Sequence, residues 1–220
     1  MIAKKNLVLP AITSVVCLLP LCLSFAVYND LPDRTVMQWN LEGNPNWYAH
    51  KAASAFGLPI FFMVFNIALY FLFCSDSKRK NISKAMQAFT CWLVPVVSII
   101  ITPLVLFMNL GVNLPMQMII LSLMGVLFIF TGNYLPKNRQ NYTVGIRLPW
   151  TLNSAENWNK THRMASVLFI IGGMLFIITA FLPLKNVVGI LIILTIVIIT
   201  VIVPALYSYS IHVKDKNKNR

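Results

Sequence analysis

Six long apolar runs, separated by polar segments, dominate the chain. Each run is close to the roughly 20 residues that an α-helix needs to cross a hydrocarbon core of about 30 Å. No Asp, Glu, Lys, Arg or His interrupts any of them. The pattern therefore predicts an all-α integral membrane protein with six transmembrane helices, at residues 7–27, 55–74, 85–108, 114–131, 164–183 and 187–209.

The Lys and Arg residues are unevenly shared between the segments that connect these runs. If the six spans alternate in direction, only Arg34, Lys51 and Lys185 of the eighteen Lys and Arg residues fall on one side. Positive residues near helix ends are retained in the cytoplasm. We therefore expect both termini and the polar segment 132–163 to be cytoplasmic, and the segment 28–53 to be extracellular.

Composition supports a multi-pass membrane protein and favours lipid over nucleic acid as its partner. Hydrophobic residues make up 58% of the chain, charged residues 11%, and the mean hydropathy is +0.73, which excludes an ordinary soluble globule. The net charge of +12 lies in short clusters beside the apolar runs. This arrangement favours contact with the lipid bilayer and its anionic headgroups over direct binding of nucleic acid.

Ionisable and polar residues also limit the chemistry that we expect. Proton-coupled carriers usually need an ionisable residue inside the membrane, and the six runs contain none. The polar residues within the runs include Asn66, Ser98 and Thr102. Such residues more often form hydrogen bonds to neighbouring helices than take part in transport. The four cysteines show no metal-binding spacing, so we expect no metal and no cofactor.

The spans and loops suggest two modules. Residues 1–80 would form an N-terminal two-helix membrane module with the extracellular loop 28–53. Residues 81–220 would form a four-helix module with the cytoplasmic loop 132–163.

The extracellular segment is predicted to be a turn-rich loop, because Pro and Gly punctuate it. Its Trp and Tyr residues, among them Trp47 and Tyr48, are typical both of recognition surfaces and of anchors at headgroup depth, and both interpretations stay open. The candidate binding residues of this loop are Pro32, Trp39, Asn40, Gly43, Pro45 and Lys51.

The cytoplasmic segment shows two patterns. Apolar residues alternate with others from Tyr142 to Trp150, which predicts an extended strip with one apolar face. Asn153 followed by Glu156 resembles a capping box, so a helix should begin near Ser154 and place Trp158 and His162 on one face. One structural interpretation is that this segment anchors the loop at the lipid headgroups. The candidate binding residues are Asn133, Pro136, Lys137, Asn141, Gly145, Arg147, Pro149, Trp150, Thr151, Trp158, Thr161, His162 and Arg163.

An enzyme is not favoured by these residues. Glu156, Thr161 and His162 supply the residue types of an acid, a nucleophile and a base. Adjacent helical side chains diverge by roughly 100°, however, so Thr161 and His162 cannot form a nucleophile-base pair. We therefore expect no catalytic residues. The alternative is a membrane-embedded enzyme or carrier that acts on lipid, peptide or a cell-wall precursor.

Several motifs in the second half resemble the signature of the SdpI family of bacterial immunity proteins. They are Asn133-Tyr134-Leu135-Pro136-Lys137, Asn141-Tyr142, Val144-Gly145-Ile146-Arg147, Pro149-Trp150-Thr151-Leu152, Trp158 and Thr161-His162-Arg163. The first loop is similar to a small membrane domain of unknown function that often precedes this signature. It departs from that domain's pattern at Gln38, where His is frequent, and at Asn46-Trp47, where Asp-Gly is frequent.

The resemblance implies a protein of the bacterial cell membrane that protects the producing cell from a secreted peptide toxin. It also implies signal transduction, in which a small winged-helix (ArsR-like) autorepressor is held at the membrane while toxin is present. Toxin bound outside would stabilise one arrangement of the second to fifth helices. A docking surface of Arg147, Trp158, His162 and Arg163 would then face the repressor inside.

Overall fold

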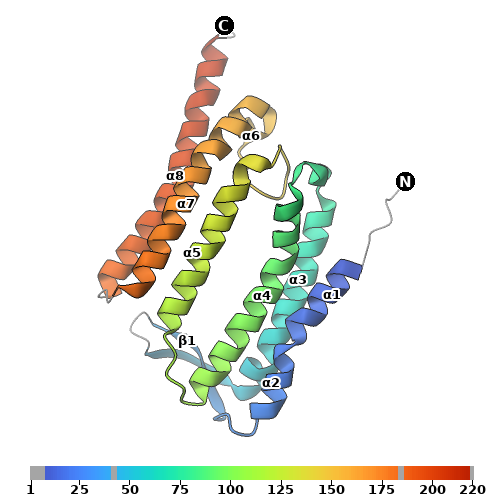
Figure 1. The fold of residues 1–220 in the computed structure, drawn as a ribbon, viewed down its shortest axis with the longest axis vertical. Coiled ribbons are helices and arrows are strands. Elements are labelled where there is room, and N and C mark those ends of the chain that lie inside the picture. The colour runs from blue at the N-terminus through green and yellow to red at the C-terminus, as the bar shows by residue number, and fades with distance from the viewer. Residues whose placement is uncertain (1–7, 41–43, 183–185, 219–220) are drawn as a thin grey trace. The chain divides into compact units, whose positions relative to one another are not determined.

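The computed structural model describes residues 8–40, 44–182 and 186–218. Within these ranges, six helical stretches are long and apolar enough to cross a membrane. They are Val8–Val27 (α1 Val8–Leu18 and α2 Pro20–Val27), Ala53–Ser75 (η1 Ala53–Gly57 and α3 Leu58–Ser75), α4 Lys84–Asn109, Met116–Lys137 (α5 Met116–Tyr134 and η3 Leu135–Lys137), α7 Ala155–Phe181 and α8 Asn186–Lys218 (Figure 1). The predicted six-helix fold is confirmed, whereas the side of the membrane that each terminus faces stays a prediction.

Packing divides the chain into two compact units. The first unit runs from the N-terminal helices to Cys74 and adds Gln87–Met116, and the second combines Ser75–Met86 with the chain from Gln117 onward. Most of α4 thus packs with the N-terminal helices, so this partition follows contacts and differs from the two modules described from the sequence.

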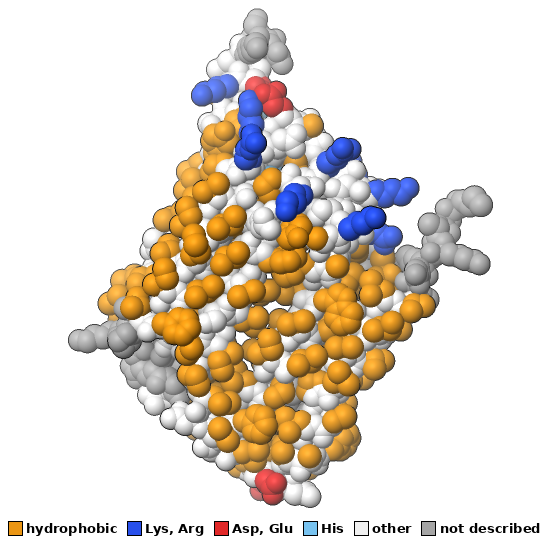
Figure 2. Space-filling view, viewed as in Figure 1, with side chains coloured by type: hydrophobic (Ala, Val, Ile, Leu, Met, Phe, Trp, Pro, Cys, Tyr) orange, Lys and Arg blue, Asp and Glu red, His pale blue; other side chains and the backbone are white. Residues whose placement is uncertain are grey.

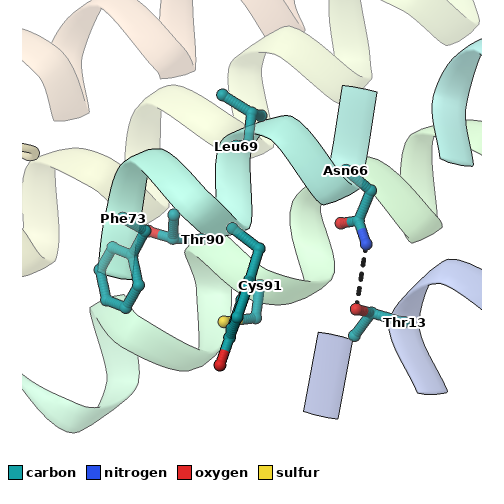
Figure 3. A pocket seen from close by; sticks show the side chains of 7 residues that line it. Thr13, Asn66, Leu69, Phe73, Thr90 and Cys91 are labelled. Carbon is teal, nitrogen blue, oxygen red and sulfur yellow. Dashed lines mark hydrogen bonds between the residues drawn. The ribbon is translucent and has the colours of Figure 1, made fainter. Parts of the chain in front are cut away.

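Polar side chains join the helices of the first unit. The Asn66 amide Nδ2 on α3 donates to Thr13 Oγ1 at 3.0 Å on α1, in a small pocket that Thr90 and Cys91 of α4 also line (Figure 3). Ser98 Oγ on α4 donates to the Cys17 carbonyl at 2.8 Å. The interhelical roles expected for Asn66 and Ser98 are confirmed, and such bonds are favourable where lipid offers no polar partner.

Segment 28–53 is not only the turn-rich loop that its Pro and Gly content predicts. It forms an antiparallel hairpin of β1 (Arg34–Trp39) and β2 (Pro45–His50). Pro45 stands at the first position of β2, which is one of the few strand positions that tolerate proline. The β-branched and aromatic residues of both strands favour pairing more strongly than the turn residues at their ends oppose it.

The second unit rests on close helix contacts. A Cβ added to Gly125 on α5 would lie 2.6 Å from the Gly173 carbonyl oxygen on α7, so these backbones meet only because both residues are glycine. The Asn157 amide Nδ2 on α7 donates to the Ser208 carbonyl on α8 at 2.9 Å. These contacts fix α5, α7 and α8 against one another and position the segment between α5 and α7.

The segment between α5 and α7 is also not the predicted extended strip. Residues 142–145 form successive bends, and Pro149–Asn153 form a short helix, α6. Pro149 occupies the first helical turn, where its missing N–H costs nothing. Figure 2 shows Lys and Arg side chains grouped together on the face in view, and hydrophobic side chains covering most of the rest of that face.

Candidate functional site

Trp158 and His162 form the buried centre of the polar segment. Their rings stack with centroids 3.9 Å apart, and both side chains are 0% exposed. The Trp158 indole N–H donates to the Asn138 carbonyl at 2.9 Å. The predicted packing of these two rings is confirmed. Their burial corrects the predicted docking surface, because neither ring can touch a partner in the folded protein.

His162 also holds the loop that crosses it. Its Nε2 accepts a hydrogen bond from the Ile146 N–H at 3.0 Å, and its Nδ1 lies 2.8 Å from the Trp158 carbonyl oxygen. An acceptor at Nε2 and a donor at Nδ1 require the neutral ring with its proton on Nδ1. The imidazole is therefore a structural link between α7 and the loop.

Gly145 allows this crossing. Its φ is +119°, a region that side-chain-bearing residues avoid, and an added Cβ would collide with His162 Nε2. The same Cβ would lie 3.2 Å from the Trp158 ring. Glycine is thus required at position 145 for two reasons, the close approach of the His162 and Trp158 rings and the positive φ of the backbone.

Asn141 and Thr151 satisfy the backbone of the loop. Asn141 Oδ1 accepts from the N–H groups of Thr143 and Val144 at 3.0 and 2.7 Å. Thr151 Oγ1 accepts from the Leu148 N–H at 2.9 Å and lies 2.8 Å from the Ile146 carbonyl oxygen, to which it can donate. Both side chains are buried, so these polar residues replace the backbone bonds that an irregular segment lacks.

Asp76 is a structural residue that the sequence analysis missed. Its Oδ2 accepts from the Tyr142 N–H at 2.9 Å and from Thr143 Oγ1 at 2.7 Å, and its Oδ1 accepts from the Lys78 N–H at 2.7 Å. The carboxylate is nearly buried and is satisfied by these donors. A single acid at the start of a basic run was the available signal, but nothing in the sequence pairs it with residues 142–143.

Asp76 belongs to what we call the loop pair, residues 75–83 and 138–143. The Asn81 amide Nδ2 donates to the Gln140 carbonyl at 2.6 Å, and the Arg139 N–H donates to the Asn81 carbonyl at 2.9 Å. The Ser83 N–H donates to Asn138 Oδ1 at 2.8 Å. Hydrogen bonds along its whole length thus join two segments that lie about sixty residues apart in the chain.

Half of the exposed candidate residues of the signature are basic. Asn133, Pro136, Lys137, Arg147, Pro149 and Arg163 are exposed. Arg147 is oriented by its bond to the Tyr142 carbonyl at 2.5 Å, and Lys137 Nζ lies 4.2 Å from the Tyr134 ring centroid. We define the basic surface as six of the exposed cations of this unit: Lys80, Lys84, Lys137, Arg139, Arg147 and Arg163. None of them forms an ion pair with a described residue.

Trp150 packs on α8, and Thr161 bonds to Asn157, which in turn bonds to α8. The Trp150 ring packs on Tyr209 and His212, with centroid distances of 5.4 and 5.9 Å. The Thr161 hydroxyl donates to Asn157 Oδ1 at 3.0 Å, and Glu156 accepts from Lys160 at 2.6 Å. Thr161, Glu156 and His162 are therefore bonded to different groups and do not form the triad that a hydrolase needs.

The candidate residues of segment 28–53 lie around the hairpin. Trp39 pairs with Pro45, and Asn40 closes the turn through its bonds to the N–H and carbonyl of Asn44 at 2.8 and 2.9 Å. Lys51 Nζ lies 3.1 Å from the Asp33 carboxylate. Pro32 is exposed in the segment that leads into β1, and Gly43 lies outside the described residues. These candidates shape the hairpin and do not converge on one cavity.

Asn109 fixes the hairpin to the end of α4. Its Oδ1 accepts from the Val36 N–H at 2.6 Å, and its Nδ2 donates to the Val36 carbonyl at 2.9 Å. The side-chain amide thus bonds to both backbone groups of one residue in β1, as a neighbouring strand would. Asn109 is not among the residues predicted from the sequence, because an amide at a helix end carries no signal for a strand seventy-three residues away.

Comparisons with known proteins identify similar sequences over both halves of the chain. The family described as the SdpI/YfhL protein family matches residues 137–208, and a domain of unknown function, DUF1648, matches residues 15–63. The Immunity protein SdpI of Bacillus subtilis (strain 168) is 26% identical over 201 residues, which cover 89% of this chain and 95% of that protein. No solved structure matches the chain. The chain is therefore similar to the SdpI/YfhL protein family over residues 137–208 and to DUF1648 over residues 15–63, and it is similar to an immunity protein along nearly its whole length.

Proposed function

We propose that this chain is an immunity protein of the bacterial plasma membrane that gives resistance to a secreted, membrane-active peptide toxin. The observation that carries the proposal is its similarity to an immunity protein across 89% of its length, which includes both polar segments. The six apolar helices supply the membrane location that such a role needs. The uneven distribution of Lys and Arg supports an external hairpin and a cytoplasmic basic surface.

The hairpin is the surface that we assign to the toxin. Trp47 and Tyr48 are 55% and 50% exposed on β2. Large aromatic side chains contribute strongly to protein recognition, because they bury much apolar area at a small cost in conformational entropy. The bond between Asn109 and Val36 holds β1 in place, so β2 is presented on a fixed support.

The basic surface is the part that we assign to an ArsR-like autorepressor. Arg147 and Arg163 are exposed, and the stacked Trp158 and His162 hold the surrounding loop from inside. Cations without an ionic partner favour an acidic protein surface and direct its approach. In this proposal Trp158 and His162 support the docking surface and do not contact the repressor.

Survival of a sensitive bacterium tests the immunity proposal. Cells that express the wild-type chain should survive a sporulation-delaying type of peptide toxin that kills cells carrying an empty vector. The Trp47→Ala, Tyr48→Ala variant should protect less at equal membrane abundance. Val112→Ala, which truncates an exposed residue of the turn after α4, is the matched control and should protect fully. Death of cells with abundant wild-type protein would contradict the proposal.

Pull-down of the repressor encoded beside the gene tests the docking assignment. The Arg147→Ala, Arg163→Ala variant should bind about tenfold more weakly, which corresponds to roughly 1.4 kcal/mol for two exposed charges. The Lys214→Ala, Lys216→Ala variant removes two exposed cations near the end of α8 and should bind as wild type. Equal binding by both variants would show that the repressor does not use the basic surface.

A further inference from the structure

The outer edge of β2 has a definite hydrogen-bonding pattern that follows from the clamp on β1. The Val36 N–H and carbonyl both bond to Asn109, so they point away from β2. Opposite residues in an antiparallel pair alternate between a pair that exchanges two hydrogen bonds and a pair whose backbone groups point outward on both strands. Val36 lies opposite Tyr48. The Tyr48 N–H and carbonyl therefore point away from β1.

A second hydrogen bond predicts the same alternation of inward and outward backbone groups along the two strands. The Lys51 N–H donates to the Asp33 carbonyl at 3.0 Å, which makes Asp33 and Lys51 face each other as a bonded pair. Counting along the register, Thr35 and Ala49 are again a bonded pair, whereas Arg34 lies opposite His50 in an outward pair. Tyr48 and His50 thus present two N–H groups and two carbonyls along one edge.

The two edges of the hairpin differ. Asn109 occupies the outer edge of β1, but β2 has no second neighbouring strand in the part of the chain that the structure describes. All residues of β2 except the half-buried Ala49 are exposed. Pro45 at the start of β2 and the irregular register between Val36 and Trp39 leave three residue pairs in regular register, and on β2 only Tyr48 and His50 of these pairs face outward. Such an edge suits a short extended segment better than a long sheet.

We propose that the outer edge of β2 is a strand-addition site, at which an extended apolar segment of the peptide toxin bonds to the backbone of Tyr48 and His50. This inference rests on the proposed immunity function and names the mode of recognition. Backbone bonds would give affinity independent of toxin sequence, and the Trp47 and Tyr48 rings, which lie on opposite faces of β2, would select apolar side chains on the two faces of the added strand. The Asn109 clamp leaves β2 as the free edge of this small sheet.

Residue-level hydrogen exchange on the full-length protein in lipid nanodiscs tests the proposal. Without toxin, the amides of Tyr48 and His50 should exchange fast, and those of Ala49 and Lys51 should exchange slowly. Purified sporulation-delaying type toxin should slow Tyr48 and His50 by about tenfold, as expected for newly formed backbone bonds. Slow exchange at Tyr48 and His50 without toxin would mean that another strand, such as a second copy of the chain, occupies the edge, and would overturn the proposal.

Two substitutions distinguish the role of the Tyr48 backbone N–H from the role of the Tyr48 ring. Tyr48→Pro removes an outward N–H that makes no bond within the hairpin, so Ala49 and Lys51 should stay slow while toxin protection of His50 and cell survival are lost. Tyr48→Ala keeps the N–H and should retain most of the protection of His50. Unchanged survival with Tyr48→Pro would overturn the edge proposal and leave the immunity function standing. Failure of the wild-type chain to protect cells would overturn both.

Discussion

The loop pair and the hairpin are both polar segments outside the apolar helices, but they satisfy their backbones in opposite ways. In the loop pair, buried side chains such as Asp76 and Asn141 bond to backbone groups. In the hairpin, the two strands pair with each other, so most side chains of β2 stay exposed. A motif residue can therefore matter because it builds the backbone, as in the loop pair, or because it is available to a partner, as in the hairpin.

The largest effect in this comparison is expected for Gly145→Ala. The added Cβ would collide with His162, which costs about 1–3 kcal/mol as overpacking, and the positive φ adds about 1–2 kcal/mol. Gly111→Ala is the matched control, because Gly111 also has a positive φ but no atom would lie within 4 Å of the new Cβ. Unfolding by SDS in mixed micelles should show the larger loss for Gly145→Ala. Equal losses in the free energy of unfolding would mean that the His162 ring does not restrict the loop at Gly145.

Asp76→Ala should have the next largest effect. It removes the acceptor of the Tyr142 and Lys78 N–H groups, and hydrogen bonds to a charged group contribute about 1.5–3 kcal/mol each. Asp33→Ala removes an exposed carboxylate that pairs with Lys51 beside the hairpin, a kind of contact that contributes at most about 1 kcal/mol. The same unfolding measurement should therefore separate the two variants. A larger loss for Asp33→Ala would reverse the contrast between the two regions.

Asn109→Ala should have the smallest effect on global stability and a clear local effect. Loss of the two bonds to Val36 releases β1 at a cost of about 1 kcal/mol, since these groups are only partly buried and water can replace the amide. Hydrogen exchange at Val36 should become several-fold faster, while exchange at Asn141 and Thr143 stays as in wild type. Asn113→Ala, at an exposed site in the turn after α4, should change neither region. Unchanged exchange at Val36 would show that another group holds β1.

The sequence predicted the membrane helices well, because each needs only an apolar run of the right length. It also predicted the start of α7 to within one residue, with Ser154 accepting from the Asn157 N–H in place of the expected Asn153 and Glu156 pair. Trp158 and His162 were placed on one helical face, where they do stack. These successes concern local geometry, which residue spacing determines directly.

The polar segments were predicted less well, because their structure depends on partners far away in the chain. The turn residues of 28–53 suggested a loop, although cross-strand pairing makes a hairpin. The alternation from Tyr142 to Trp150 suggested a strip, although Asp76 and Asn141 draw that backbone into bends. Burial of Trp158 and His162 was also missed, since a composition rich in Trp, His and Arg does not show which members point inward.

The bond pair between Asn157 and Ser208 has a consequence for how the protein adapts to bilayers of different thickness. At 1.5 Å per residue, the apolar run at 187–209 in α8 spans about 35 Å, slightly more than a hydrocarbon core of about 30 Å. Ser208 both donates to Asn157 and accepts from it, so α8 cannot slide along α7 without breaking two buried bonds. We therefore expect α7 and α8 to tilt together in a membrane thinner than the apolar run of α8. Such a tilt would change the orientation of the surface carried by α7 and would leave the register between the two helices unchanged.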